Sequence, residues 1–389
     1  MKISAEYIWI DGSNADKPTK TLRSKNQILQ LGQSKNTPKE KTFGQLSTSV
    51  DQYEMANLLR HQNWWGDGPE MPLQFRMEDL LDLQIPDWGF DGSSTLQADA
   101  KPSDRPLIPV CALINPLRKR SILILCEVFG KDGKHPHATN TRRAMVETYA
   151  RFTAEEPWFG IEQEYTLYHG GLMARVPYGW PEKGPATEQG KYYCGVGLDE
   201  APGRQIAMEH EDACRDAGLL IRGTNAEVMP GQWEFQTDTG NPVTVSDHLW
   251  LMRYLLYRIA AKHNASVKLD PKPVSGDWNG AGAHTNFSTL GMRKEYSACE
   301  EACKKLETNF KKNGFPSMYG AGYEKRLTGA HETCSHKEFR YGVADRAASI
   351  RIPLHVKVRG AGYIEDRRPC ANIDPYEVTT FLMKTICKV

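Results

Sequence analysis

Two glutamates spaced two residues apart are the first candidates for chemistry. Glu162 and Glu164 lie in Gly160–Leu167, where apolar and polar residues alternate as in a strand. Side chains two apart on a strand share a face, so both carboxylates would project to the same side. An isolated pair of this kind usually lies on a solvated strand edge. Beside further acidic residues, the pair could hold a divalent cation.

A second acidic pair flanks a turn. Glu227 lies before Pro230-Gly231 and Glu234 lies after it, each three residues away. If the two arms form a tight hairpin, the two carboxylates face each other directly. Opposed like charges destabilise a sheet, so this arrangement needs either a bound cation or a fully hydrated position. The cation is favoured by the apolar neighbours Val228, Met229, Trp233 and Phe235.

A histidine follows a glycine-rich loop in the third polar segment, Asn279–Ser288. The glycines allow the backbone to approach a ligand closely, and His284, Asn286 and Ser288 alternate onto one face. A lone histidine is more often a buried structural residue, but the acidic pairs favour a ligand here. Carboxylates with a single imidazole suit Mg²⁺ or Mn²⁺ rather than zinc. Such ions bridge nucleotide phosphates during phosphoryl transfer.

The elements that must position these residues alternate along most of the chain. Periodicity predicts strands at 7–12, 121–129, 160–168 and 266–269, and helices at 142–153, 206–217, 248–263, 294–312 and 376–388. We therefore expect an α+β protein with domains 1–134 and 141–389. The polar stretch 34–78, with a helix expected near 50–60, is interpreted as an insertion into the first domain.

Composition excludes several other classes of protein. With 389 residues, 25% charged residues and a net charge of +1, neither disorder nor nucleic-acid binding is expected. The N-terminus lacks a signal-peptide pattern, and the longest apolar run, 122–126, is too short to span a membrane. Nine cysteines without a C-x-x-C pair indicate reduced thiols in a cytoplasmic compartment; for Cys299 and Cys303, reduced thiols are favoured over a zinc site.

Further motifs occur in the order of one known family. Phe90–Thr95 matches that family's N-terminal signature, and Lys272–Val274 followed by Asn279–Ser288 matches its ATP-region signature. Other matching segments are Trp158–Tyr165, Tyr192–Gly197, Asn225–Gln236, Arg326–Gly329, Ala344–Pro353 and Glu365–Pro369. On these segments the chain resembles the eukaryotic-type (class II) glutamine synthetases over nearly its whole length, except for about 34–78.

The resemblance implies a fold and a reaction. The fold is an N-terminal β-grasp domain with a C-terminal catalytic domain of antiparallel sheet and helices. The reaction is ATP-dependent ligation of ammonia to L-glutamate, giving glutamine, ADP and phosphate through γ-glutamyl phosphate, with two or more Mg²⁺ or Mn²⁺ ions per site. The implied assembly is a homo-oligomer, a decamer of two pentameric rings, with active sites between neighbouring subunits.

The resemblance also implies roles for individual residues. One metal is held by Glu164, Glu227 and Glu234, and the other by Glu162, His284 and Glu365; Glu162 and Glu234 also count among the ATP-binding residues. Glutamate is bound by Asn279, Gly280 and Arg367, and the phosphate and ATP by Arg326, Arg346 and Arg351. The nucleotide is contacted by Asn286, Ser288 and Tyr363. Ammonium loses its proton to Asp91, with Tyr193 and Ser94 nearby, and Glu332 is the flap acid that closes the site.

These roles agree with the chemistry that such a reaction needs. A carboxylate is a poor acyl donor until it is phosphorylated, so arginines and metals must bring two anions together and stabilise the moving phosphoryl group. Ammonium cannot attack until a base removes its proton. Closure of a flap keeps water from the acyl phosphate.

Two departures from the family pattern leave alternatives open. Residues 34–78 are much longer than the family's usual connection before Phe90. They could be a peripheral insertion, or they could act as a regulatory device at a subunit interface. Leu354 stands where many members have arginine, which could alter nucleotide contacts. The competing functions are a glutamate ligase for a larger amine, a catalytically silent homologue and a phosphoguanidine kinase, which has no need of the Asp91 loop.

Overall fold

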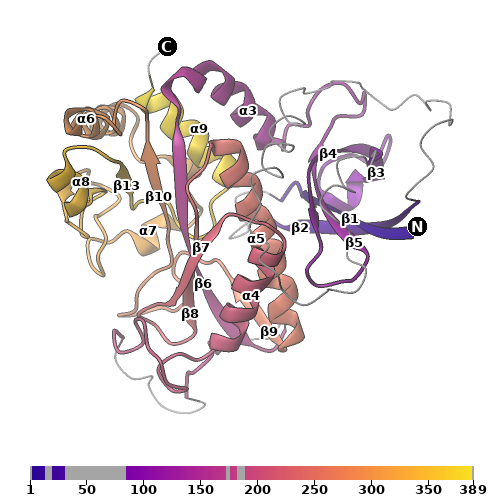
Figure 1. The fold of residues 1–389 in the computed structure, drawn as a ribbon, viewed down its shortest axis with the longest axis horizontal. Helices are drawn as coiled ribbons and strands as arrows, with labels where there is room; N and C mark the ends of the chain where they lie inside the picture. The colour runs from indigo at the N-terminus through magenta and orange to yellow at the C-terminus, as the bar shows by residue number, and fades with distance from the viewer. Residues whose placement is uncertain (1, 14–19, 31–84, 172–175, 182–188, 388–389) are drawn as a thin grey trace, which may run out of the picture. The chain divides into compact units, whose positions relative to one another are not determined.

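A computed structural model describes residues 2–13, 20–30, 85–171, 176–181 and 189–387 (Figure 1). The expected insertion at 34–78, with its helix, lies outside the described residues. The chain divides into two compact units. The first comprises Met1–Ser13, Thr21–Arg143 and Ala213–Leu219, and the second comprises Asn14–Lys20, Ala144–Asp212 and Leu220–Val389.

The first unit is built on a five-stranded sheet. Its strands are β1 (Lys2–Ile10), β2 (Leu22–Gln30), β3 (Trp88–Asp91), β4 (Asp104–Ile114) and β5 (Ser121–Val128), in the order β2-β1-β5-β4-β3. The pair β1–β5 is parallel and the other pairs are antiparallel. Every residue of the central strand β5 is buried, which explains its apolar run 122–126. The sheet also presents the short 3₁₀ turn Gly92–Thr95 directly after β3.

The second unit is built on an eight-stranded sheet. Its strands are β6 (Trp158–His169), β7 (Ile221–Ala226), β8 (Gln232–Thr237), β9 (Ala265–Lys268), β10 (Ala283–Ser288), β11 (Tyr341–Val343), β12 (Ile350–Ile352) and β13 (Ile364–Asp366). The order is β11-β12-β13-β10-β6-β8-β7, and β9 pairs with β6. The sheet is antiparallel except for the parallel pair β11–β12. The α+β class expected from the sequence is confirmed, with a mixed sheet in this unit.

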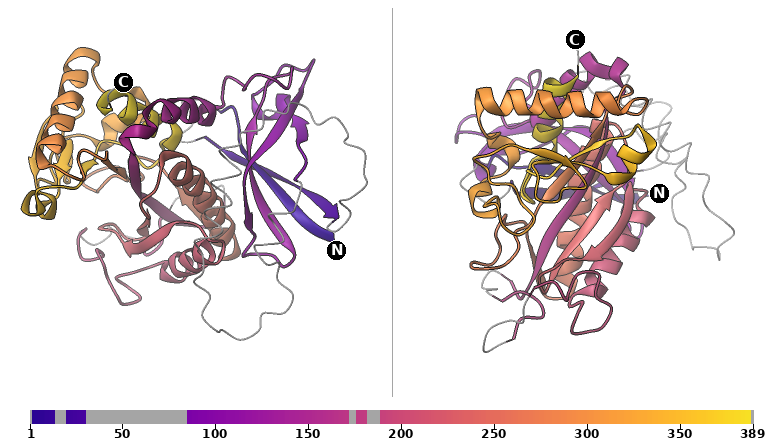
Figure 2. Two further views of the ribbon diagram at one scale, coloured as in Figure 1. Left: turned by 45° about the horizontal axis from the view of Figure 1, so that its top comes forward. Right: turned by 90° about the vertical axis from the view of Figure 1, so that its left-hand side faces the viewer.

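Helices cover one face of this second sheet. The α-helices among the described residues are α3 (Thr141–Phe152), α4 (Arg204–Asp216), α5 (Pro242–Lys262), α6 (Tyr296–Asn313), α7 (Tyr323–Arg326), α8 (Leu354–Arg359) and α9 (Pro375–Ile386). Helix α5 packs on β6 and β8 and against α9 (Figure 1), and α6 packs against α9 (Figure 2). Between α5 and the sheet lie fully buried apolar side chains, among them Ile161, Tyr165 and Phe235.

Most of the predicted elements are confirmed. Helices expected at 142–153, 206–217, 248–263, 294–312 and 376–388 correspond to α3, α4, α5, α6 and α9, and the predicted strands correspond to β1, β5, β6 and β9. Helix α5 begins earlier than expected because Asn241 caps the backbone N–H of Thr244 and Pro242 occupies the first helical turn. Strands β2 and β4 were not predicted from the sequence.

Two expectations from composition have structural counterparts. Each of the nine cysteines is a free thiol, and Cys299 and Cys303 are both buried on α6. Among the helices that the structure describes, none combines the length and apolarity needed to cross a membrane.

Candidate active site

The sheet face turned away from α5 carries several charged side chains from neighbouring strands. Register fixes this arrangement: Glu162 on β6 lies opposite His284 on β10, and Glu164 lies opposite Glu234 on β8. Because side chains alternate along a strand, a partner in register keeps its side chain on the same face. The intervening Gln163 points the other way, where its side-chain oxygen accepts a hydrogen bond from Arg253 of α5. The shared face expected for Glu162 and Glu164 is therefore confirmed.

One compact group on this face has the composition of a cation site. Nδ1 of His284 lies 3.6 Å from a carboxylate oxygen of Glu162 and 3.6 Å from one of Glu365. Among the described residues, these three form the one group of at least three histidine, cysteine or acidic side chains whose ligand atoms all lie within 4.8 Å of one another. His284 and Glu365 are buried and Glu162 is partly exposed, so the group opens toward one side.

The chemistry of this group fits a divalent cation. Burial lowers the pKa of His284 well below its usual value, and the charge of Arg367 lowers it further. The imidazole is therefore neutral, which is the form that binds a metal. Two carboxylates with one imidazole nitrogen are the donors that a hard cation such as Mg²⁺ or Mn²⁺ accepts.

Three further glutamates on the same sheet face form no ion pair within the part of the chain that the structure describes, although the charges of Arg326 and Arg367 act on Glu164. Burial, followed by the neighbouring carboxylates, raises the pKa of Glu234 well above its usual value and that of Glu227 to about 8. Burial also raises the pKa of Glu164. Amides support these carboxylates: Gln232 donates to Glu164 at 3.0 Å, Asn225 to Glu227 at 3.1 Å and Gln236 to Glu234 at 2.6 Å. Neutral donors do not remove the mutual repulsion, but a cation would.

The hairpin that carries Glu227 and Glu234 differs from the tight hairpin considered above. Asn225, not Glu227, lies opposite Glu234. The backbone N–H of Gln232 bonds to the carbonyl of Met229, with Pro230 second and Gly231 third at φ +72°, as in a type II turn. The backbone N–H of Glu227 also donates to the carbonyl of Gln232, so residues 228–231 connect the two arms. The register is thereby displaced by two residues, which preserves the face. Direct opposition was therefore wrong, whereas Glu164 and Glu234 do oppose each other across β6 and β8.

Arginines surround the carboxylate of Glu365. Arg367 Nη1 lies 2.7 Å from one oxygen, and Arg351 Nε donates to the other. Arg326 is buried, with Nη2 2.9 Å from Nε2 of His284 and Nη1 donating to backbone carbonyls of residues 367–369. Arg346 is exposed, and its carbonyl accepts a hydrogen bond from Arg367. Clustered guanidinium groups beside a cation site suit a phosphate.

A second ion pair, unrecognised in the sequence, orients this part of β13. Asp366 points to the opposite face from Glu365 and accepts hydrogen bonds from Arg368 at 2.6 Å and from the Tyr319 hydroxyl at 2.6 Å. All three side chains are at most 3% exposed. Because neighbouring strand residues face opposite sides, anchoring Asp366 below the sheet keeps Glu365 and Arg367 above it.

Two of the residues expected to contact the nucleotide, Asn286 and Ser288, lie on β10 beyond His284. Asn286 donates to Glu162 at 2.8 Å, and the Ser288 hydroxyl accepts from Arg293 at 3.0 Å. Arg293 also lies over the ring of the exposed Trp158, 3.8 Å from its centroid. Burial, followed by Glu162, raises the pKa of the half-buried Tyr363.

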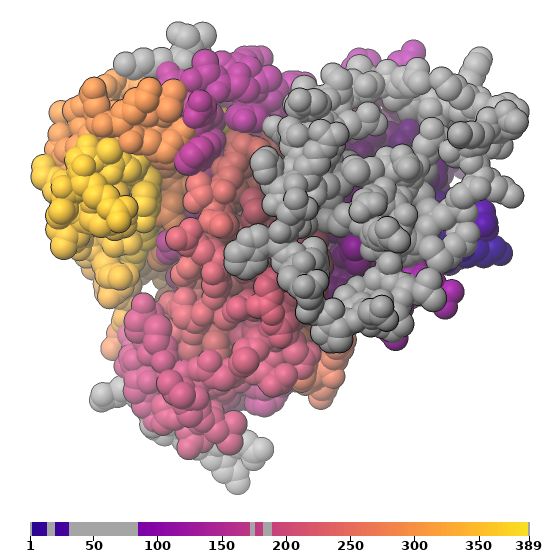
Figure 3. Space-filling model, in the orientation of Figure 1, coloured from indigo at the N-terminus to yellow at the C-terminus, as the bar shows by residue number. Residues whose placement is uncertain are grey.

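Leu354, at the position where arginine is common, begins the short surface helix α8 beside α6 (Figure 3). Its side chain is 59% exposed. An exposed leucine offers no charge to a phosphate, whereas Arg351 on β12 and Arg367 directly after β13 do.

Loops supply the remaining candidates in the second unit. The backbone N–H of Asn279 donates to Gln189 Oε1 at 2.8 Å. At Gly280 a Cβ would lie 2.5 Å from the carbonyl oxygen of Pro271, so this close approach requires glycine. Burial, followed by Cys194, raises the pKa of the half-exposed Tyr193. Glu332 adopts φ +55°, and its carboxylate lies 3.9 Å from Arg367.

In the first unit, Asp91 caps the 3₁₀ turn Gly92–Thr95. Its carboxylate accepts hydrogen bonds from Ser93 Oγ at 2.7 Å and from Ser94 Oγ at 2.8 Å. These hydrogen bonds lower the pKa of Asp91 to about 2, and the bond from Ser93 has the largest effect. The carboxylate is exposed and ionised at neutral pH, so it offers a negative charge to a cation such as ammonium. Gly92 is required because a Cβ there would lie 2.7 Å from Cγ of Arg105.

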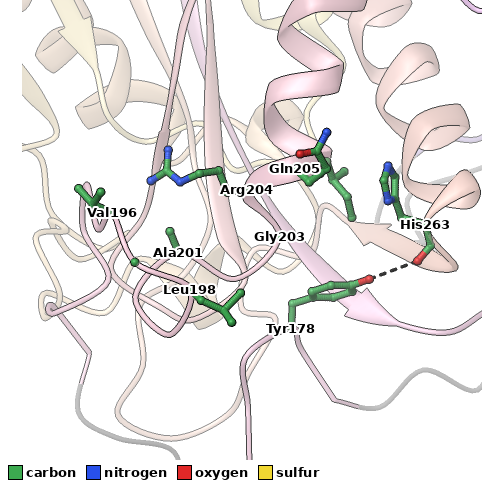
Figure 4. A pocket seen from close by; sticks show the side chains of 10 residues that line it. Tyr178, Val196, Leu198, Ala201, Gly203, Arg204, Gln205 and His263 are labelled. Carbon is green, nitrogen blue, oxygen red and sulfur yellow. Dashed lines mark hydrogen bonds between the residues drawn. The ribbon is translucent and has the colours of Figure 1, made fainter.

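A pocket of about 330 Å³ lies among residues outside the expected site (Figure 4). Tyr178, Leu198, Arg204 and His263 contribute to its lining, and the Tyr178 hydroxyl donates to the carbonyl of His263 at 3.3 Å. None of the residues singled out from the sequence as ligands or catalytic groups lines it.

Comparison with known proteins gives consistent matches. Residues 140–311 match the family described as glutamine synthetase, catalytic domain. The chain is 48% identical over 388 residues to the glutamine synthetase of Streptomyces viridochromogenes, covering 100% of this chain and 97% of the relative. It is 45% identical over 390 residues to that of Streptomyces hygroscopicus, with coverage of 100% and 97%. It is 49% identical over 313 residues to the chloroplastic enzyme of Chlamydomonas reinhardtii, covering 78% of this chain and 80% of the relative.

Proposed function

Because the chain belongs to the glutamine synthetase family, we propose that the charged sheet face built around Glu162, His284 and Glu365 is the site where it phosphorylates glutamate. Its activity is that of a glutamate–ammonia ligase. The observation that carries the site assignment is the convergence of this compact cation group with Arg351 and Arg367, both paired to Glu365.

The carboxylates hold divalent cations, Mg²⁺ or Mn²⁺, in two places. Glu162, His284 and Glu365 hold one, and Glu164, Glu227 and Glu234 hold the other. Support comes from the neutral imidazole in the first group and from the repulsion among the carboxylates in the second. Bound cations supply charge neutralisation for ATP and for the transferred phosphoryl group.

The arginines and the loops bind the anionic substrates. Arg326, Arg346 and Arg351 bind phosphate and ATP, whose nucleotide is contacted by Asn286, Ser288 and Tyr363. Asn279 and Gly280 receive the amino-acid end of glutamate, while Arg367 binds its carboxylate. Fixed guanidinium groups stabilise the charge that develops on the phosphoryl group without reorganising during the reaction.

Asp91 is the base for the second half-reaction. Its exposed and ionised carboxylate takes a proton from ammonium, with Ser94 and Tyr193 contributing to the ammonium site. The resulting ammonia nitrogen bonds to the γ-carbon of the acyl phosphate as the bond from that carbon to the phosphate oxygen breaks, and phosphate leaves with a proton from the nitrogen. Glu332 closes the site so that water does not compete.

The assembly proposed is a homo-oligomer, a decamer of two pentameric rings, in which Asp91 of one subunit serves the site of a neighbour. The domains proposed are 1–134 and 141–389, and the compartment proposed is the cytoplasm, in keeping with nine free thiols.

A coupled assay tests the reaction. Phosphate release from ATP with glutamate should depend on a divalent cation and rise sharply with ammonium. Preference for ethanolamine or a polyamine would indicate a ligase for a larger amine, and no turnover with any amine would indicate a silent homologue.

Replacement of the base tests the assignment of Asp91. Asp91→Asn should leave ATP and glutamate binding intact, measured by calorimetry, while reducing ammonia-dependent turnover by about 10²–10⁴-fold, the usual contribution of a general base. Ser93→Ala, which removes one hydrogen bond to the carboxylate, is the milder control. Unchanged turnover in Asp91→Asn would remove this residue as the base.

A further inference from the structure

Three loops of the second unit meet at the side chain of His331. Nδ1 of His331 lies 2.9 Å from the amide nitrogen of Gln189, and Nε2 lies 2.9 Å from a carboxylate oxygen of Asp277. The same Gln189 accepts a hydrogen bond from the backbone N–H of Asn279 at 2.8 Å. The imidazole thus joins the segment before Tyr193, the loop before Gly280 and the flap that carries Glu332.

The direction of every hydrogen bond in this network follows from one backbone group. A backbone N–H can only donate, so the Gln189 atom facing Asn279 is the carbonyl oxygen. The amide nitrogen of Gln189 then faces His331 and donates to Nδ1. Nε2 of the neutral imidazole therefore carries the proton and donates to Asp277. Each of the three contacts thus pairs one donor with one acceptor.

The backbone of the flap needs such an anchor. His331 and Glu332 adopt φ +53° and +55°, two consecutive left-handed residues, neither of which is glycine. This conformation is unfavourable for residues with a Cβ and persists only where surrounding contacts impose it. On the C-terminal side, the hydroxyl of the buried Thr333 donates to the carbonyl of Ala330 at 2.7 Å. On the N-terminal side, the His331 side chain supplies the contacts to other loops.

We propose that His331 is a positioning residue that couples the Glu332 flap to the backbone at Asn279, so that the flap is held closed when the amino-acid loop is in its binding conformation. The inference rests on the proposed function, in which Asn279 binds glutamate and Glu332 closes the site. His331 itself touches no reacting atom.

The coupling has a chemical consequence. If the flap opens while γ-glutamyl phosphate is present, a water oxygen bonds to the γ-carbon and the bond from that carbon to the phosphate oxygen breaks. Glutamate and phosphate are released, and one ATP has been consumed without forming glutamine. The ratio of phosphate released to glutamine formed therefore reports how well the flap is held.

The test compares this ratio in three variants. In His331→Ala the ratio should rise severalfold above one, and KM for glutamate should rise by up to about tenfold, as expected for losing a hydrogen-bonded anchor. His331→Gln offers an amide that can accept from Gln189 and donate to Asp277, and should restore the ratio toward one. His336→Ala is the matched control, because His336 lies in the same segment and its Nδ1 lies 3.2 Å from the carbonyl oxygen of Leu327, apart from the Gln189–His331–Asp277 network. Its ratio should stay at one.

The outcomes separate this inference from the proposed function. If His331→Ala lowers phosphate and glutamine equally, so that the ratio stays at one, His331 has only a structural role and the inference is wrong. If the unmodified protein forms no glutamine, the proposed function fails instead. Should His331→Ala fail to fold, Gln189→Ala removes the contact between Gln189 and His331 while leaving His331 in place. An unchanged ratio in that variant would equally overturn the inference.

Discussion

Two buried glutamate sites, one in each unit, show opposite electrostatics. In the first unit, burial raises the pKa of Glu127, but Arg142 and Arg143 more than reverse this, so its pKa lies below the usual value. Both arginines bond to its carboxylate, at 2.8 and 2.7 Å. In the second unit, Glu234 is almost as deeply buried, but neighbouring carboxylates raise its pKa further.

The difference separates structure from function better than burial does. The charge of Glu127 is balanced by arginines of its own unit. Its ion pairs therefore stabilise the folded protein without any bound ligand. Glu234 and its neighbours form a site whose charge is balanced only when something positive binds. A buried carboxylate that lacks a basic partner is thus a candidate ligand, although Glu365, paired with Arg351 and Arg367, shows that an arginine partner does not exclude that role.

The sharpest test of the balanced site is Glu127→Gln. Removing one partner leaves two guanidinium groups without their counter-charge, which should lower the free energy of unfolding by about 3–5 kcal/mol. Denaturant unfolding measures this loss. Specific activity per folded molecule should be retained, and a large loss of kcat in protein that remains folded would contradict a purely structural role.

At the unbalanced site, Glu234→Gln should have the reverse profile. Activity should fall by about 10²–10³-fold, the scale expected when one preorganised electrostatic group is removed. The metal-free protein should become no less stable, because the substitution relieves repulsion among carboxylates. Steady-state kinetics and denaturant unfolding on the same preparation provide both values. A strongly destabilised metal-free variant would place Glu234 in the same class as Glu127.

Cation binding should separate the two sites directly. Mg²⁺ or Mn²⁺ at about 100 times its Kd should stabilise the protein by about 2.7 kcal/mol through binding to the folded state alone. Thermal unfolding with and without the cation measures the shift. Glu127→Gln should keep this increment, whereas Glu234→Gln should lose most of it. Equal increments in both variants would show that the cation binds elsewhere.

The two sites should also differ in the pH dependence of stability. The pKa of Glu227 is raised to about 8 from its usual 4.5 in the metal-free protein. Its contribution to stability is complete below pH 4.5 and is lost as the pH rises through about 8. Glu127 has the opposite sign, and its contribution is lost only as the pH falls through its lowered pKa.

Melting temperatures across this pH range test the contrast at Glu227. The metal-free protein should lose stability as the pH rises toward 8, and Glu227→Gln should remove part of that slope. Cation binding should tighten with rising pH, because the metal competes with protons for the carboxylates. A slope that is the same in both proteins would contradict the raised pKa.

Local pattern was sufficient for much of the fold and for part of the site, whereas Glu365 and the arginines were assigned only through the family resemblance. Alternation predicted that Glu162 and Glu164 share a face, and helical periodicity located α3 and α6, because both signals are carried by neighbouring residues. The register of Glu227 against Glu234 was missed because it depends on how the Met229–Gln232 turn closes.

Tertiary contacts account for the other residues that the sequence did not reveal. Gln189, Asp277 and His331 are distant in the chain, and nothing local marks any of them as partners. Gln232 and Gln236 could have been found, since they alternate with Glu234 on β8 and therefore share its face. The pairing of Asp366 with Arg368 below β13 has a similar local signal in its spacing of two residues.

The alternation of β6 also limits how this chain can change in length. Deleting or adding a single residue between Gly160 and Glu164 would rotate one glutamate toward α5 and bring an apolar side chain to the charged face. Length variation is therefore tolerable between strands but not within them. The long polar stretch at 34–78 falls between β2 and β3 in the sequence, in a connection where added length leaves the alternation of every strand intact.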